Sequence, residues 1–111
     1  MEPAYELGAP FLPLEAYDAS FTTPNEELGR GASGVVRRAI RKSDGVAVAV
    51  KTIDLRALRV MGGFSISRLR REVEVMLGLR HPNIVELYGA YGNSDGVRLV
   101  MELVEGRELF D

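Results

Sequence analysis

Three glycines, Gly29, Gly31 and Gly34, form the part of the chain best suited to bind a phosphate group. Glycine lets the backbone turn tightly and approach a ligand closely, so that successive N–H groups can face anionic oxygens. Ala32 and Ser33 lie between the last two glycines and belong to the same loop. The spacing alone is weak support for a ligand, because a glycine-rich hairpin turn has the same pattern.

Two other nucleotide-binding motifs can be compared with this loop. The dinucleotide-binding fingerprint would use an acid such as Asp54, twenty residues after Gly34, but it requires a helix directly after the glycines. Residues 35–53 are rich in β-branched side chains and are interrupted by Asp44 and Gly45, so no helix is predicted there. A Walker-type loop is excluded because the sequence contains no Gly-Lys-Ser or Gly-Lys-Thr.

A lysine and a glutamate complete the group of residues that could bind phosphate. Strand alternation places Ala47, Ala49 and Lys51 on one face, which leaves room for a flat ring and directs an ammonium toward the glycine loop. Glu72 borders the apolar side of a predicted helix, where its carboxylate can reach back and hold Lys51. The alternatives are a solvated lysine at a strand end and an exposed helix glutamate.

The spacing of apolar residues predicts the elements that position these side chains. Five β-rich runs occupy residues 27–30, 35–41, 46–53, 84–91 and 97–104. An amphipathic helix is predicted from about Ile66 to Gly78, with Ser65 or Ser67 as its cap. The predicted fold class is therefore α+β, a five-stranded antiparallel sheet with one covering helix. The other face of the sheet meets either solvent or something outside the sequence.

The first 24 residues differ in amino-acid composition from the rest. Four of the five prolines lie there, in a stretch that is acidic and lacks strand alternation. We expect an extended tail over residues 1–24 and a domain over residues 25–111.

Three arginines on the predicted helix, Arg68, Arg70 and Arg71, are interpreted as a solvated face.

Composition excludes several classes of protein. The 111 residues carry a formal charge of −2 and no cysteine, which fits one small domain and excludes disulfide scaffolds, thiolate zinc sites and cysteine nucleophiles. The lack of cysteine favours a cytoplasmic or nuclear location. No apolar run is long enough for a membrane segment. Residues 30–60 carry eight bases and two acids, but these alternate with valine and alanine, which disfavours nucleic-acid binding.

The order of the motifs resembles that of a known family. A glycine loop, the strand Val48-Ala49-Val50-Lys51, a helix glutamate and the corner His81-Pro82-Asn83-Ile84 occur in the order of the amino-terminal lobe of protein kinases. The resemblance covers residues 26–111. The closing sequence LVMELVEGRELFD is most similar to serine/threonine kinases of the calcium/calmodulin-dependent type.

The resemblance implies a role for each matched position. The glycine loop would cover the phosphates of ATP, Lys51 would contact the α- and β-phosphates, and Glu72 would be its ion-pair partner. Six further positions would surround the nucleoside: Val36 and Ala49 above the adenine, Met101 as gatekeeper, the Glu102 carbonyl and Val104 N–H at the adenine edge, and Glu108 near the ribose. Ser33 stands where the family most often has an aromatic residue, which weakens the apolar cover over the phosphates.

The implied activity of a full-length parent is transfer of the γ-phosphoryl of MgATP to serine or threonine hydroxyls of a protein substrate. The 111 residues contain no His-Arg-Asp, Asp-Phe-Gly or Ala-Pro-Glu segment, so we expect the magnesium ligands to lie elsewhere and this chain alone to be inactive. With half of the cleft, its affinity for ATP should also be poor. The alternative is a kinase-like nucleotide-binding or regulatory module without catalysis.

Overall fold

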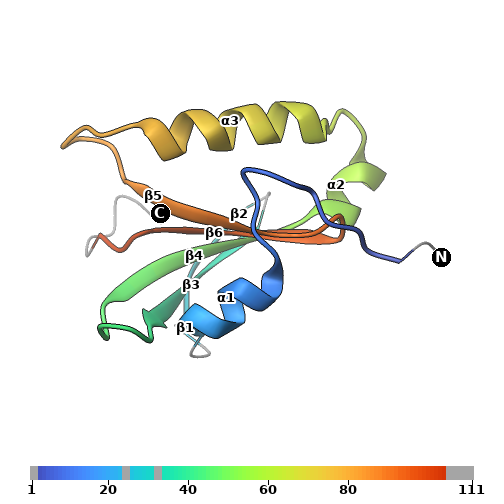
Figure 1. The fold of residues 1–111 in the computed structure, drawn as a ribbon. Coiled ribbons are helices and arrows are strands. Elements are labelled where there is room, and N and C mark those ends of the chain that lie inside the picture. Colours follow the sequence, from blue (N-terminus) through green and yellow to red (C-terminus); the bar gives the residue numbers. More distant parts are fainter. Residues whose placement is uncertain (1–2, 24–25, 32–33, 105–111) are drawn as a thin grey trace.

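One antiparallel sheet organises the chain, with helices on both of its faces. The computed structural model describes residues 3–23, 26–31 and 34–104. In chain order its elements are α1 (Leu14–Ser20), β1 (Phe21–Thr22), β2 (Glu27–Gly31), β3 (Gly34–Arg41), β4 (Ala47–Asp54), α2 (Leu55–Met61), α3 (Ile66–Gly78), β5 (Leu87–Gly92) and β6 (Gly96–Glu102). The strand order is β1-β3-β4-β6-β5, with β2 also paired to β3. Helix α3 lies on one side of the sheet and α1 on the other (Figure 1).

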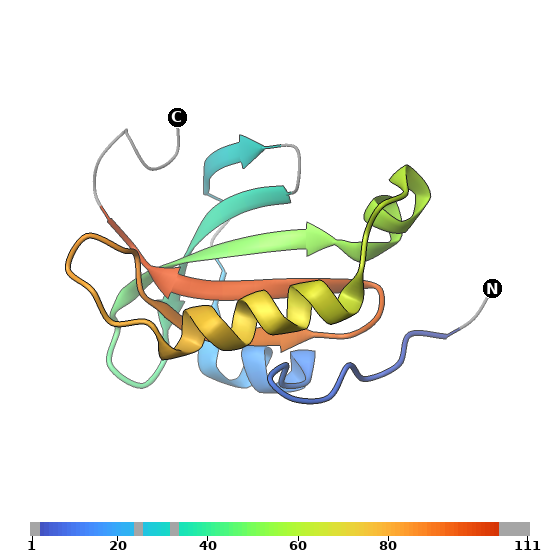
Figure 2. The same ribbon diagram turned by 90° about the horizontal axis from the view of Figure 1, so that it is seen from above.

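The α+β class and the antiparallel sheet confirm the sequence prediction. Strands β2, β3 and β4 begin and end within one residue of the predicted runs, and α3 occupies the predicted helix. The prediction of a single helix is wrong, because the described residues form three, together with the two-residue strand β1. In Figure 2, where the molecule is seen from above, α3 runs along the sheet.

Residues 14–22 differ most from the sequence prediction, which expected an extended tail here. This part of the expected extended tail forms α1 and β1, and β1 pairs with β3. The prolines do not prevent the helix, because Pro13 stands at its N-cap and none lies within it. Tyr17 of α1 and Phe21 of β1 are buried, at 1% and 8% exposure, and their rings stack on each other. The sheet face opposite α3 is therefore covered by the chain's own N-terminal segment.

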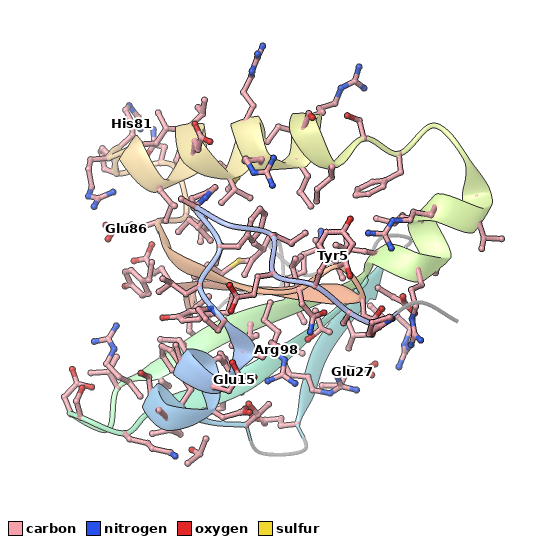
Figure 3. The ribbon with its side chains drawn as sticks, turned by 45° about the vertical axis from the view of Figure 1, so that its right-hand side comes forward. Tyr5, Glu15, Glu27, His81, Glu86 and Arg98 are labelled. Carbon is pink, nitrogen blue, oxygen red and sulfur yellow. The ribbon has the colours of Figure 1, made fainter. Side chains whose placement is uncertain are left out.

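Alternation along β4 divides the core between the two faces of the sheet. Val48 and Val50 point toward α1 and pack with Tyr17 and Phe21, whereas Ile53 packs on the α3 side with Val73. On the α1 side the Arg98 guanidinium lies over the Tyr17 ring, 4.6 Å from its centroid. Figure 3 shows Arg98 and Glu15 on this side of the sheet. The α3 side of the sheet, where Lys51 also lies, is left to form the candidate site.

Side-chain caps fix the beginnings of α2 and α3. The Asp54 carboxylate accepts a hydrogen bond from the Ala57 N–H, and the Ser65 hydroxyl accepts one from the Arg68 N–H. Each cap satisfies a backbone donor that the first turn of a helix leaves unpaired. Of the two predicted caps for α3, the structure uses Ser65. Helix α2 ends at Met61, and the φ of 81° at its C-cap, Gly62, favours glycine.

Candidate functional site

The register of four strands places the key side chains in one row. Gly29 pairs with Val36, Val36 pairs with Lys51, and Lys51 pairs with Leu99. Directly paired residues of neighbouring strands lie on the same face of a sheet. Leu99 belongs to the core on the α3 side, so the whole row faces α3. The sheet therefore presents the Lys51 ammonium toward this helix.

A cavity of about 570 Å³ lies between this row and α3. Val36, Lys51 and Met101 border it from the sheet, and Arg68 and Glu72 border it from the helix. Most of the remaining wall is apolar: Ile53, Leu58, Phe64, Leu69, Val73, Met76 and Leu99. A space with apolar walls and a few convergent charges can hold a flat apolar group together with an anion.

Lys51 and Glu72 border the same cavity without forming an ion pair. Among the ion pairs between described residues, none joins these two side chains. Lys51 is half-buried and Glu72 is exposed. The pairing that the family resemblance implies thus stays a prediction.

A close approach of the β3 and β4 backbones requires glycine at one end of the glycine loop. Gly31 pairs with Gly34 at the end of the β2–β3 hairpin. A Cβ built on Gly34 would lie 2.0 Å from the Thr52 carbonyl oxygen, whereas one on Gly31 would meet nothing within 4 Å. Only glycine fits at position 34, because the Thr52 carbonyl is part of the β4 backbone and cannot rotate away as a side chain could. Ala32 and Ser33 lie outside the described residues.

The positions expected around the nucleoside are only partly brought together. Val36 and Met101 border the cavity. Ala49 pairs with Met101 but is fully buried and does not reach the cavity wall. Glu102 ends β6 and Val104 follows it, both away from the cavity wall, while Glu108 lies outside the described residues. The roles of these last four residues stay predictions.

The arginines of α3 correct the interpretation of a fully solvated face. Arg68 borders the cavity beside Glu72. Arg70 points to the N-terminal segment and donates a hydrogen bond of 2.6 Å from its Nη2 to the Leu7 carbonyl. The four-residue spacing from Arg68 to Glu72 could have indicated a shared helix face. No local signal indicates the partner of Arg70, because it lies 63 residues away.

Two groups away from the cavity have a shifted pKa. A hydrogen bond from the Val46 N–H, with help from the Arg41 guanidinium, lowers the pKa of the Asp44 carboxyl in the β3–β4 turn. Burial raises the pKa of the Tyr91 phenol, which lies against Tyr17 and Phe21. Neither group borders the cavity, so neither shift acts on the candidate site.

Two further properties bear on function. In the part of the chain that the structure describes, no three acidic or histidine side chains gather where they could hold a metal ion. No helix among these same residues has the length and apolar character needed to cross a bilayer.

Comparison with known proteins decides the family. A family model described as "Protein kinase domain" matches residues 22–111. This chain belongs to the protein kinase domain family. It is 46% identical over 100 residues to calcium-dependent protein kinase 34 of Arabidopsis thaliana, covering 89% of this chain and 18% of that protein. It is 31% identical over 133 residues to NUAK family SNF1-like kinase 1 of Mus musculus, covering 98% and 20%.

A solved kinase structure agrees with the family assignment. The crystal structure of Rad53 1–466 in complex with AMP-PNP superposes with a TM-score of 0.68 and 34% sequence identity, covering 81% of this chain and 22% of that chain. The protein kinase resemblance inferred from the motifs is thus confirmed, and calcium-dependent protein kinases are among the relatives. This kinase-family chain spans about a fifth of the length of the curated relatives it matches.

Proposed function

We propose that this chain is the ATP-binding lobe of a serine/threonine protein kinase. The observation that carries the proposal is the row across β2, β3, β4 and β6, which sets Gly29, Val36 and Lys51 on the face that borders the cavity. A lysine in register with a glycine hairpin of the same sheet suits the binding of a polyphosphate. The AMP-PNP bound to the Rad53 chain supports a nucleotide as the ligand.

The residues present fit a nucleotide. Val36 and Met101 offer apolar surface for the base, and Lys51 offers the charge that orients the phosphates. The close approach of Gly34 to the Thr52 carbonyl leaves no room for a side chain at this end of the glycine loop, and glycine lets a backbone approach a phosphate closely. These residues bind and orient the nucleotide and transfer no proton.

Magnesium does not fit the described residues, because no three acidic or histidine side chains among them gather into a metal site. We propose that its ligands, and the groups that bind the protein substrate, belong to parts of the kinase beyond these 111 residues. In that longer protein the γ-phosphoryl of ATP would pass to a serine or threonine hydroxyl. The contribution of this chain is the position and charge of Lys51.

The test replaces each of the two lysines of the chain in the longest protein that carries it. Lys51→Met keeps most of the alkyl stem and removes the cation, so phosphoryl transfer to a generic protein substrate should fall about 100-fold or more. Lys42→Met is the matched control, because Lys42 lies in the β3–β4 turn and its ammonium donates to the Asp18 carbonyl. Undiminished transfer by Lys51→Met would overturn the proposed role, and a parent without any transfer would overturn the proposed activity.

A further inference from the structure

A second cavity, of about 350 Å³, lies on the α1 side of the sheet. Its apolar wall consists of Tyr17 and Phe21 together with Val50 of β4. The other residues that line it are polar or charged and come from five different segments of the chain: Asp18, Thr23, Arg37, Thr52 and Arg98. None of these residues borders the cavity beneath α3, so the two cavities are separate.

The strand register brings two arginines to this cavity. Arg37 of β3 pairs with Val50 of β4, and Thr52, two residues further along β4, pairs with Arg98 of β6. Side chains alternate along a strand and directly paired residues share a face, so all four lie on the α1 side of the sheet. Strand β4 runs between the two arginines, which places the Thr52 side chain between them.

The Arg37 guanidinium is a half-buried cation without a carboxylate partner in the described part of the chain. None of the ion pairs found there includes it. Glu27, the acid directly across from Arg37 on β2, instead accepts a hydrogen bond of 2.7 Å from Arg30. Burial of a charge is favourable when an opposite charge compensates it. An anion in the cavity would supply the charge that Arg37 lacks.

The second arginine, Arg98, keeps hydrogen-bond donors available. Its Nη1 lies 3.4 Å from the carboxylate of Asp18, which is 71% exposed, and its guanidinium lies over the Tyr17 ring. An exposed ion pair of this kind contributes little stability. A guanidinium has five N–H donors in a planar fork, so Arg98 can stay on the ring and donate to a second anion. Asp18 is the group that competes with that anion.

Hydroxyl groups add further donors to this site. The Tyr17 hydroxyl and the Thr23 Oγ1 form a hydrogen bond. When Tyr17 donates in this bond, Thr23 keeps its own proton for an anion in the cavity. Thr52 contributes a second hydroxyl from the sheet. Phosphate suits such a donor set, because its several oxygens accept from guanidinium and hydroxyl groups at the same time.

The size and the border of the cavity favour a phosphate that is carried by a side chain. One water molecule occupies about 30 Å³ in the liquid, so 350 Å³ has room for a phosphate together with the atoms that carry it. Asp18 and Thr23 are exposed, so the cavity opens to solvent where they border it. A side chain of another protein can therefore enter from this direction.

We propose that this cavity binds a phosphoserine or phosphothreonine side chain of a partner protein, and that Arg37 and Arg98 recognise its phosphate. Clusters of arginine are a general means of phosphopeptide recognition. The site is independent of ATP binding, because Lys51 and the glycine row face the other side of the sheet.

The test is a titration of the ¹⁵N-labelled 111-residue chain with phosphothreonine that is acetylated and amidated at its ends. We expect the amide signals of Arg37, Thr52 and Arg98 to shift with a dissociation constant of about 1 mM or lower. The same derivative of threonine without phosphate should cause no shift, and inorganic phosphate should bind about threefold more weakly. Unchanged signals at these three residues would overturn the proposal. Equal or tighter binding of inorganic phosphate would assign the site to the free ion and overturn the choice of ligand.

Two adjacent arginines of β3 provide a matched pair of variants. Arg37→Gln removes the cation from the cavity and should raise the dissociation constant about tenfold. Arg38→Gln removes the same charge from the opposite face, where Arg38 pairs with Ala49 and its Nε lies 3.9 Å from Glu26, and should change the constant less than twofold. Equal weakening in both variants would show a general effect of net charge and overturn the assigned site.

Two other variants test the site if Arg37→Gln does not fold. Thr52→Val keeps the branched shape of the side chain and loses the hydroxyl, so it should raise the dissociation constant about threefold. Asp18→Asn removes the carboxylate that competes for Arg98 and should lower the constant about twofold. An unchanged constant in both variants, or changes of the opposite sign, would overturn the proposal.

Discussion

The close approach of Gly34 to the Thr52 carbonyl is the tightest constraint on a single residue of the candidate site. Gly34→Ala must push β3 away from β4, and we expect it to lower the free energy of unfolding by about 1 to 3 kcal/mol. Gly31→Ala is the matched control, because its Cβ would meet nothing within 4 Å. Urea unfolding of both variants tests the prediction. Equal stabilities would show that the hairpin does not lie against β4 as described.

The half-buried phenol of Tyr91 predicts a dependence of stability on alkaline pH. Burial raises its pKa in the folded chain above the ordinary value of 10.0, so its contribution to stability is complete below pH 10 and is lost as pH rises through the folded pKa. Tyr91→Phe has no phenol to ionise and should lose less stability than the wild type between about pH 9 and pH 11. Urea unfolding across this range checks the difference. Parallel losses in the two proteins would exclude Tyr91 as the source.

At the scale of elements, Ser65 and Ser67 provide a matched pair for the start of α3. The Ser65 hydroxyl accepts from the Arg68 N–H, whereas Ser67 lies exposed within the helix. Ser65→Ala should cost about 1 kcal/mol of unfolding free energy, and Ser67→Ala should cost little or slightly stabilise. Chemical unfolding followed by circular dichroism distinguishes them. A larger loss for Ser67→Ala would place the helix start elsewhere.

The docking of α1 makes a stronger prediction. Tyr17 is 1% exposed, stacks on Phe21 and belongs to the core cluster on the α1 side, so Tyr17→Ala should cost about 3 to 5 kcal/mol, in the range of large aromatic truncations. Glu15→Ala changes an exposed residue of the same helix and serves as the control. Both are compared by thermal unfolding. If Tyr17→Ala were as stable as Glu15→Ala, the N-terminal segment would not belong to the folded unit.

The long strands and α3 could be predicted from sequence because their periodicity extends over several residues. The seven-residue helices α1 and α2 could not, since helices this short depend on burial of a few side chains such as Tyr17 and Leu55. In the site, alternation placed Lys51 on the correct face of β4. The lack of an ion pair between Lys51 and Glu72 among the described residues could not be predicted, because the position of α3 depends on contacts such as that of Arg70 with Leu7, far away in sequence.

At the scale of the whole molecule, the two faces of the sheet differ in how they are covered. The face toward α1 is covered in part by the chain's own aromatic residues, whereas the face toward α3 keeps a cavity of about 570 Å³ with Lys51 at its border. A lobe that offers one wall of a nucleotide site should bind ATP weakly by itself. Calorimetric titration of the 111-residue chain should therefore show no tight complex, and a micromolar dissociation constant would contradict this expectation.

We propose that this cavity and the glycine hairpin together bind a nucleotide. Titration of the ¹⁵N-labelled chain with ATP, followed by amide chemical shifts, tests it most directly. We predict shifts that begin at about millimolar ATP and concentrate at the glycine loop, Val36, Lys51 and Met101, and that disappear in Lys51→Met. Shifts confined to the α1 side of the sheet, or an identical response in Lys51→Met, would contradict the account.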